Sequence, residues 1–273
     1  PPPIGSTVVA LRSTGRIDAD SSIEKIIQVR LGIISLAKYA ILANDNLRFG
    51  TGTFAFGPVH SNYGIDYDGI AYNIVYSAQP QYDDPDHGGF NEFGVHTHVA
   101  PVDPLPPAPV PSRPDIFAAG REFPVPAVDF TGFTSALAKI KTKAQAGGLY
   151  FSSSSASGYH IVLKTNDTFD LYRVTALTPR PPSCNNILGQ EDWGTWSIDT
   201  ETFLQNYPFP ANGLIFVEDD LWVHGQIDTA RLTIAAGTFP ENSQTDKSIT
   251  VNNDITYTNY DGRDVLALFA QEN

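Results

Sequence analysis

The sequence predicts a mainly β protein in which short strands stack as a β-solenoid-like coil. Near the C-terminus, runs of three or four apolar or β-branched residues follow one another, usually across a few polar residues, at 214–217, 221–223, 232–234, 249–251 and 255–257. Strands this short cannot bury a face alone, so they must stack on neighbouring strands. Strand-like pieces also run from Leu47 to Tyr76, where five glycines punctuate them as coil corners or bulges would.

The N-terminal part predicts a separate hairpin. Residues 7–31 alternate apolar and polar positions, and the turn-like clusters 13–15 and 18–21 interrupt them. The next segment, 32–42, fits a short helix and a buried strand equally well. We therefore expect an N-terminal unit, 1–46, of two strands and a short helix, followed by a β-solenoid-like domain, 47–273.

Three further elements are expected within the second domain. Residues 79–128 contain eleven prolines and predict an irregular excursion or arm rather than a packed sheet. A helix follows, capped by Asp129 or Thr131, with an apolar stripe of Phe133, Leu137, Ile140 and Ala144, and it ends at Gly147-Gly148. Apolar runs at 159–163 and 169–174 then predict a hairpin across 165–167.

Charge and targeting signals restrict the partners. The formal net charge of −13 disfavours nucleic acid, because an acidic surface repels phosphate. No run of 18 apolar residues predicts a membrane span. The chain starts Pro-Pro-Pro and contains no Met, so we expect an excised ectodomain that reaches a membrane only through a helix upstream of this sequence. The single cysteine, Cys184, cannot form an internal disulfide and is interpreted as incidental.

One histidine pair is the main candidate for a metal site. His96 and His98 are alternate residues, so on a strand they would share a face and could ligate one ion, with Zn²⁺ favoured over Ca²⁺. Residues nearby in sequence that could complete the site are Asp83, Asp84, Asp86, His87 and Asp103. The alternative is a polar, solvated loop beside the proline-rich segment, with no cofactor at all.

Other polar clusters favour structural roles. His60-Ser61-Asn62 is expected to satisfy backbone groups at a turn, because adjacent strand residues point to opposite faces and cannot form a Ser-His pair. The candidate Ca²⁺ ligands are commoner as turn formers and match no EF-hand or nonapeptide spacing: Asp66, Asp68, Asp219, Asp220, Asp246, Asn252, Asn253 and Asp254. No P-loop, GxGxxG, GxSxG or HExxH motif occurs.

Four blocks of sequence resemble a known family. The opening strands at 8–17 and 23–29 are similar to the first strands after the N-terminal helix of prepilin-like proteins. Residues 39–50, leading to Gly57-Pro58-Val59-His60-Ser61-Asn62-Tyr63-Gly64-Ile65, resemble the signature of PilX-type type IV pilus assembly proteins and minor pilins with β-solenoid insertions. Residues 212–225 look like a rung of the same group, and residues 265–271 look like its closing strand.

The resemblance implies a non-enzymatic, extracellular ectodomain of a minor pilin or pilus-associated protein, acting in filament assembly, adhesion or surface contact. It implies a pilin-type N-terminal hairpin, a location at the cell surface or pilus, and other pilin subunits as partners. A surface glycan or protein receptor is a further expected partner, contacted by exposed aromatic residues: Phe90, Phe93, Trp193, Trp196 and Tyr207.

Two other functions remain open from the residues alone. A β-helix polysaccharide lyase or hydrolase would use paired carboxylates on the face of the coil. A carbohydrate-binding module would use Trp193 and Trp196 to bind glycan.

Overall fold

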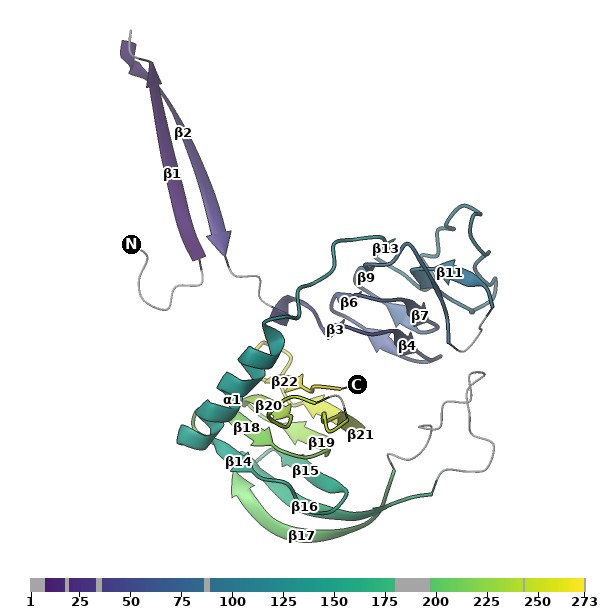
Figure 1. Ribbon diagram of the computed structural model, residues 1–273, viewed down its shortest axis with the longest axis vertical. Helices are drawn as coiled ribbons and strands as arrows, with labels where there is room; N and C mark the ends of the chain where they lie inside the picture. The colour runs from purple at the N-terminus through teal and green to yellow at the C-terminus, as the bar shows by residue number, and fades with distance from the viewer. Residues whose placement is uncertain are drawn as a thin grey trace.

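The computed structural model describes residues 8–17, 20–32, 36–85, 89–179, 197–242 and 244–272. These residues form a mainly β structure with one α-helix and many short parallel strand pairings, as predicted at the level of fold class (Figure 1). No helix in the described ranges is long and apolar enough to cross a membrane. Asp86, His87, Cys184, Trp193 and Trp196 lie outside the described residues.

The predicted N-terminal hairpin is present and projects away from the other elements (Figure 1). It consists of β1 (Val8–Ile17) and β2 (Asp20–Gly32), which pair antiparallel. A 3₁₀ helix (Leu36–Lys38) and β3 (Ile41–Ala43) follow, so the end of segment 32–42 takes the strand alternative. The domain boundary at residue 46 stays a prediction, although β3 pairs across it with β6.

The next strands form a first stack of parallel turns. Ile41 pairs with Val59, 18 residues further on, and Val59 pairs with Val75, 16 residues further on. Val59 of β6, Ile65 of β7 and Val75 of β9 point into the core of this stack and are fully buried. The strands before the excursion are β4 (Leu47–Phe49), β5 (Phe54–Ala55), β6 (Val59–Ser61), β7 (Ile65–Tyr67), β8 (Ile70–Ala71) and β9 (Val75–Ser77).

The proline-rich excursion is irregular from 97 to 120, as predicted, but its two ends contribute strands, so the expectation that it joins no packed sheet is wrong. It first forms an antiparallel hairpin, and its later strands then add to the stack, because β12 pairs with β7 and β13 pairs with β9 in parallel. Its Ile116 and Phe117 are buried in the first core, and this burial holds the excursion against the stack. The strands are β10 (Gln81–Asp83), β11 (Asn91–Phe93), β12 (Val95–His96) and β13 (Arg121–Glu122).

The predicted helix is present as α1 (Phe133–Gly147), but its predicted cap is wrong. Leu137 and Ala144 of the stripe are buried against β18 and β20, as the spacing requires. Gly132 occupies the N-cap position, and no side chain caps this end of the helix. Asp129 instead accepts hydrogen bonds from the backbone N and the Oγ1 of Thr131, so its carboxylate closes a local turn before the helix.

The C-terminal elements form a second stack of two facing sheets. One sheet is parallel, in the order β14-β18-β20-β22, and the other is mixed, in the order β17-β16-β15-β19-β21. Residues from both sheets, such as Ile161, Ile215 and Val223, meet in one core. The bounds are β14 (Leu149–Phe151), β15 (Gly158–Lys164), β16 (Thr168–Leu177), β17 (Ile198–Pro208), β18 (Leu214–Val217), β19 (Leu221–Ile227), β20 (Arg231–Ala236), β21 (Ile249–Tyr257) and β22 (Val265–Phe269).

The predicted strands of this stack are present, with one difference. The hairpin at 159–174 is formed by β15 and β16. The runs 249–251 and 255–257 belong to a single strand, β21, because a register shift lets it continue past the polar residues between them. Val223 pairs with Val251 and Gly225 pairs with Ile255, so the Asn- and Asp-containing segment forms a bulge rather than a corner.

Candidate metal centre

Strand pairing in the first stack places three charged or ionisable residues in one column. Strands β4, β7 and β12 are parallel, and Arg48, Asp66 and His96 are register partners. Paired residues of parallel strands point to the same face, and residues alternate between faces along a strand. Ile65 and Tyr67 face the core, so Asp66 faces outward. It is nevertheless 2% exposed, as is His96.

The β10–β11 hairpin covers this outward face and brings two more carboxylates to it. Asp84 follows β10, and Glu92 lies on β11 opposite Tyr82. The Nε2 of His96 lies 3.3 Å from the Oδ2 of Asp84, 3.5 Å from the Oε2 of Glu92 and 3.8 Å from the Oδ1 of Asp66. One imidazole nitrogen therefore faces three carboxylates from three separate strands or loops.

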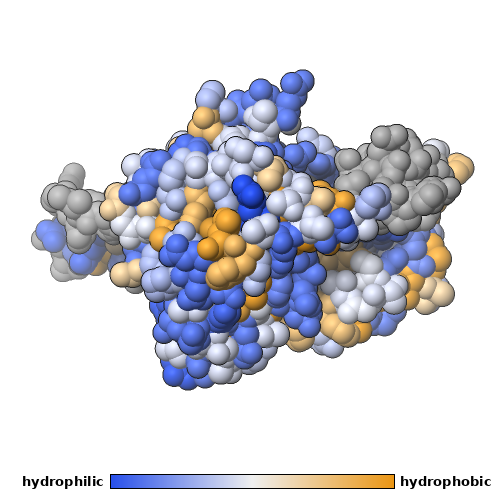
Figure 2. All heavy atoms as spheres, turned by 90° about the horizontal axis from the view of Figure 1, so that it is seen from below, coloured by the Kyte–Doolittle hydropathy of each residue, from blue (hydrophilic) through white to orange (hydrophobic). Residues whose placement is uncertain are grey.

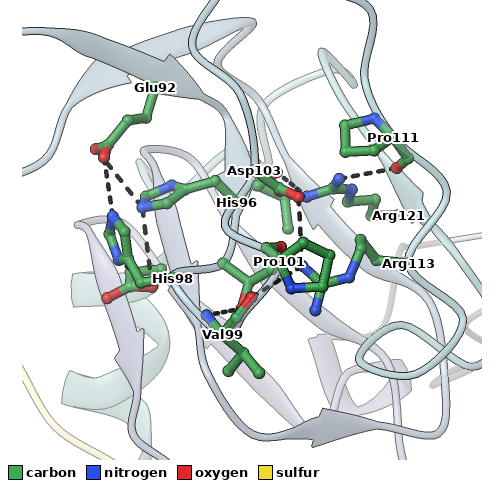
Figure 3. Close-up of polar contacts among 12 residues, drawn as sticks. Glu92, His96, His98, Val99, Pro101, Asp103, Pro111, Arg113 and Arg121 are labelled. Carbon is green, nitrogen blue, oxygen red and sulfur yellow. Dashed lines mark hydrogen bonds and ion pairs between the residues drawn. The ribbon is translucent and has the colours of Figure 1, made fainter.

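His98, two residues after His96, completes the cluster. Its Nδ1 lies 3.4 Å from the Oδ1 of Asp66, and its Nε2 lies 3.0 Å from the Oε1 of Glu92. The loop is held in place because Thr97 Oγ1 and the backbone N of His98 both donate to Asp68. In Figure 3 the carboxylate of Glu92 contacts the imidazoles of both His96 and His98.

A tyrosine ring closes the cluster from one side. The ring of Tyr82 lies 5.4 Å from the ring of His96. The same ring lies against the backbone of Gly64, where an added Cβ would come within 2.2 Å of the Tyr82 side chain. Glycine is required at position 64 for this close approach. Burial, followed by the negative charge of Asp84, raises the pKa of Tyr82, so the phenol stays neutral.

The carboxylates act strongly on His98. Its close contact with Asp66 is the largest cause that raises the pKa of His98 to about 9, and Glu92 adds to it while burial opposes it. Two carboxylates therefore favour positive charge at this position. A cationic group, whether a proton on His98 or a bound ion, is what this arrangement can hold.

Some buried atoms of the cluster lack hydrogen bonds of normal geometry. Both oxygens of Asp66 and both ring nitrogens of His96 are in this state. Buried polar atoms are nearly always hydrogen-bonded, so an unsatisfied one indicates a place for a water or an ion, stored strain or a chemical role. Asp66, Asp84, His96 and His98 each offer one ligand atom, and these four atoms lie within 4.8 Å of one another.

The sequence anticipated part of this cluster. His96 and His98 are brought together, and Asp84 joins them, although a bound metal stays a prediction. Asp83 is exposed and accepts from the backbone of Gly89. The sequence does not indicate Glu92, and it indicates Asp66 only as a candidate Ca²⁺ ligand or turn former, not as a partner of the histidines. The signal was the similarity of the dipeptides Ile65-Asp66 and Val95-His96, each an apolar residue followed by a ligand type.

Asp103 belongs to a different network, on the other side of His96 (Figure 3). Its Oδ2 accepts from Arg121 Nη1 at 2.5 Å, and its Oδ1 lies 3.7 Å from Arg113 Nη1. The two guanidinium groups also donate to backbone carbonyls of Val95, Val99, Pro101 and Pro111. The network thus supplies hydrogen-bond donors to backbone carbonyls of the proline-rich segment, where proline itself has no N–H to donate.

His60-Ser61-Asn62 has the predicted structural role. The Nε2 of His60 lies 3.1 Å from the Oδ1 of Asn62 rather than against Ser61. Ser61 Oγ donates to the carbonyl of Asp45, and Asn62 exchanges hydrogen bonds with the backbone N and O of Val128. The trio therefore joins the first turn of the stack to the segment that precedes α1.

The other candidate ligands make mainly long-range contacts. Asp219 accepts from the backbone N and Oγ of Ser154, and Asp220 accepts from the backbone N of Ser248. Asn253 accepts from the backbone N of Asp254 within the bulge of β21. Asp219 and Asp220 therefore join segments that are distant in the sequence, which differs from the local turns that the sequence predicts.

One histidine cluster was missed by the sequence reasoning. On the outer face of the second stack, His160 Nδ1 lies 2.7 Å from Glu201 Oε2, and its Nε2 lies 2.9 Å from His224 Nδ1. Burial lowers the pKa of His160, against the effect of Glu201. Register pairing of His160 with Trp222 places His224 two residues further along β19, on the same face. Pairing of this kind is not visible in the sequence.

The aromatic surface prediction is corrected at Phe93. Phe93 is only 5% exposed and its ring packs 6.0 Å from that of Phe123, because β11 turns it toward the first core. Phe90 is 68% exposed and remains available as a surface contact. Tyr207 is half-buried between Phe151 and Phe169, so its surface role stays a prediction.

Comparison with known proteins gives no match: no family model, curated protein or solved structure is similar to this chain.

Proposed function

We propose that this chain is the non-enzymatic, extracellular ectodomain of a minor pilin or type IV pilus-associated protein, acting in filament assembly, adhesion or surface contact. The observation that carries the proposal is a projecting two-stranded hairpin followed in the chain by stacks of parallel turns. The resembling blocks at 8–29 and 39–65 fall on the hairpin and the first stack. We interpret the stacks as β-solenoid coils and the hairpin as pilin-type.

The hairpin has one apolar face. Leu11 and Val29 are register partners, and Ile27 pairs with Ser13, so the three apolar side chains share a side of the ribbon. Their exposed fractions are 53% for Leu11, 58% for Ile27 and 47% for Val29. The opposite side carries Arg12, which pairs with Gln28. A two-stranded ribbon is marginally stable by itself, so this apolar face needs a partner.

The surface of the stacks supports a role in polar surroundings. On the face drawn in Figure 2, hydrophilic residues predominate and hydrophobic ones form small separate groups. In this proposal the apolar face of the hairpin makes the filament contact, while the stacks extend outward. In this proposal the partner of the hairpin is another pilin subunit.

We expect the double variant Leu11→Glu/Ile27→Glu to lose its association with filaments. Two buried carboxylates would oppose packing of the ribbon on a neighbouring subunit. In a deletion strain complemented with each form, the chain is measured by immunoblot of sheared filaments, with an expected loss of about tenfold or more. The matched control is Arg12→Glu/Gln28→Glu, which places glutamates on the other face of the hairpin. This variant should stay in the filament fraction.

Two results would count against the proposal. One is a wild-type chain that never appears in the filament fraction, combined with a deletion strain whose pili, adhesion and motility are normal. The other is equal retention of both double variants, which would remove the hairpin as the contact.

A further inference from the structure

We propose that Asp66, Asp84, His96 and His98 bind one divalent transition-metal cation, with Zn²⁺ the best match, and that Glu92 positions His98 as a ligand. The site would lie between the first stack and the hairpin that covers it. The proposal stands independently of any role in a filament, because it depends only on the geometry of the cluster.

The spacing of the ligand atoms fits coordination better than direct ion pairing. Bonds from Zn²⁺ to N and O of about 2.0–2.2 Å place the corners of a tetrahedron about 3.3–3.6 Å apart. The separations of 3.3 Å for His96–Asp84 and 3.4 Å for His98–Asp66 fall in this range, whereas His96–Asp66, at 3.8 Å, and the widest pair, within 4.8 Å, would draw closer around an ion. Charge-assisted hydrogen bonds are shorter, at about 2.7–2.9 Å.

The buried atoms of Asp66 and His96 give a second, independent argument. Both side chains are almost completely buried, and their polar atoms make no hydrogen bond of normal geometry. Leaving buried donors and acceptors unsatisfied costs about 1–3 kcal/mol per group, and more for charged groups. Coordination to one cation would satisfy Nε2 of His96 and Oδ1 of Asp66 together, while Oδ2 of Asp66 faces Arg48.

The charges are also matched by a divalent ion. Three carboxylates, from Asp66, Asp84 and Glu92, surround the histidines, and Arg48 contributes one positive charge at 3.6 Å from Asp66. With neutral imidazoles, as metal binding requires, the cluster carries two uncompensated negative charges. A divalent cation would neutralise them.

Glu92 has the position of a carboxylate that orients a ligand. The Nδ1 of His98 faces Asp66, and its Nε2 donates to Glu92 at 3.0 Å. Histidines that bind metals almost always donate their other ring N–H to a carboxylate, carbonyl or water, which fixes the tautomer. The arrangement leaves Nδ1 of His98 as the nitrogen that faces the ion.

The ligand set favours Zn²⁺ over Ca²⁺. Two imidazoles and two carboxylates suit Zn²⁺ and its transition-metal neighbours, whereas Ca²⁺ takes about six to eight oxygen ligands. The ion would join β7, the residue after β10 and the end of β12. It would therefore fasten the β10–β11 hairpin to the stack.

The test is titration of the purified 273-residue chain, freed of metal by chelator dialysis, with Zn²⁺ alone. We expect one Zn²⁺ per chain with a Kd below about 1 µM by calorimetry. Asp84→Asn should weaken binding by at least about tenfold, and Glu92→Gln by about 10–100-fold. Added Zn²⁺ should also slow hydrogen exchange across residues 81–98, and Co²⁺ should give the intense visible absorption of a four-coordinate ion.

The matched control is Asp83→Asn, which changes the neighbouring exposed carboxylate and should leave the Kd unchanged. Circular dichroism of the metal-free proteins checks that each variant folds as the wild type does. The proposal is overturned if the folded wild type binds no stoichiometric Zn²⁺, if Asp84→Asn binds as tightly as Asp83→Asn, or if Ca²⁺ binds more tightly than Zn²⁺. In the first case, protonated histidines would account for the cluster.

Discussion

Replacing Phe169 with alanine is expected to lower the free energy of unfolding of the second stack by about 3–5 kcal/mol. Phe169 is fully buried at the centre of an aromatic group, with its ring 5.6 Å from Tyr207 and 6.4 Å from Phe151. It lies on the central hairpin, paired with Leu163 and Tyr207. Its removal would leave a cavity that rigid strands on both sides cannot close.

Urea unfolding followed by tryptophan fluorescence measures this effect, because Trp222 is buried on β19 in the same stack. Phe203→Ala is the matched control in the same stack: Phe203 lies on β17 and is 52% exposed, so the same deletion there should cost no more than about 0.5 kcal/mol. Equal effects of the two variants, or a loss below about 1 kcal/mol for Phe169→Ala, would contradict the assignment of this core.

The sequence predicted most strands of the second stack because their signal is local. A run such as 214–217 is apolar and bounded by Gly213 and acidic residues, and it remains a strand wherever it packs. The stripe of α1 was equally visible, since 3.6-residue periodicity is a property of one segment. The cap was not predictable in this way, because Asp129 can serve a turn as well as a helix.

The metal candidate shows the limit of the same reasoning. The alternation of His96 and His98 was visible, but Asp66 reaches them only through the parallel pairing of β7 with β12. A parallel partner can lie many residues away, and the length of the intervening coil is not encoded in any short motif. The excursion shows the same limit. Its proline content is a local signal, whereas the burial of Phe117 depends on contacts with the distant strands of the stack.

Replacing Asp103 with alanine is expected to lower the free energy of unfolding of the first stack by about 3–5 kcal/mol. The side chain of Asp103 is 3% exposed, and those of its partners, Arg113 and Arg121, are each 5% exposed. Without the carboxylate, the buried guanidinium of Arg121 keeps only the backbone carbonyls of Val95 and Pro111 as acceptors, while Arg113 keeps Asp115. An uncompensated buried charge is costly because the interior solvates it poorly.

The measurement is urea unfolding followed by far-ultraviolet circular dichroism, together with hydrogen exchange of peptides from 95–122. All three tryptophans lie at 193, 196 and 222, so a fluorescence transition that stays in place would show that the stacks unfold separately. Asp115→Ala is the matched control, because the Asp115 side chain is 54% exposed and pairs with the same Arg113. Only the Asp115 side of this pair is exposed, and without it Arg113 keeps Asp103 and two backbone carbonyls, so Asp115→Ala should cost clearly less than Asp103→Ala.

Asp103→Asn separates the charge of the residue from its shape. The amide keeps an oxygen that can accept from Arg121, but it removes the negative charge between two cations. If the charge dominates, the asparagine variant should lose most of the stability that the alanine variant loses. If the hydrogen bond dominates, the asparagine variant should remain close to the wild type. A wild-type unfolding midpoint for both variants would mean that the prolines and the buried Phe117 hold the excursion without this ion pair.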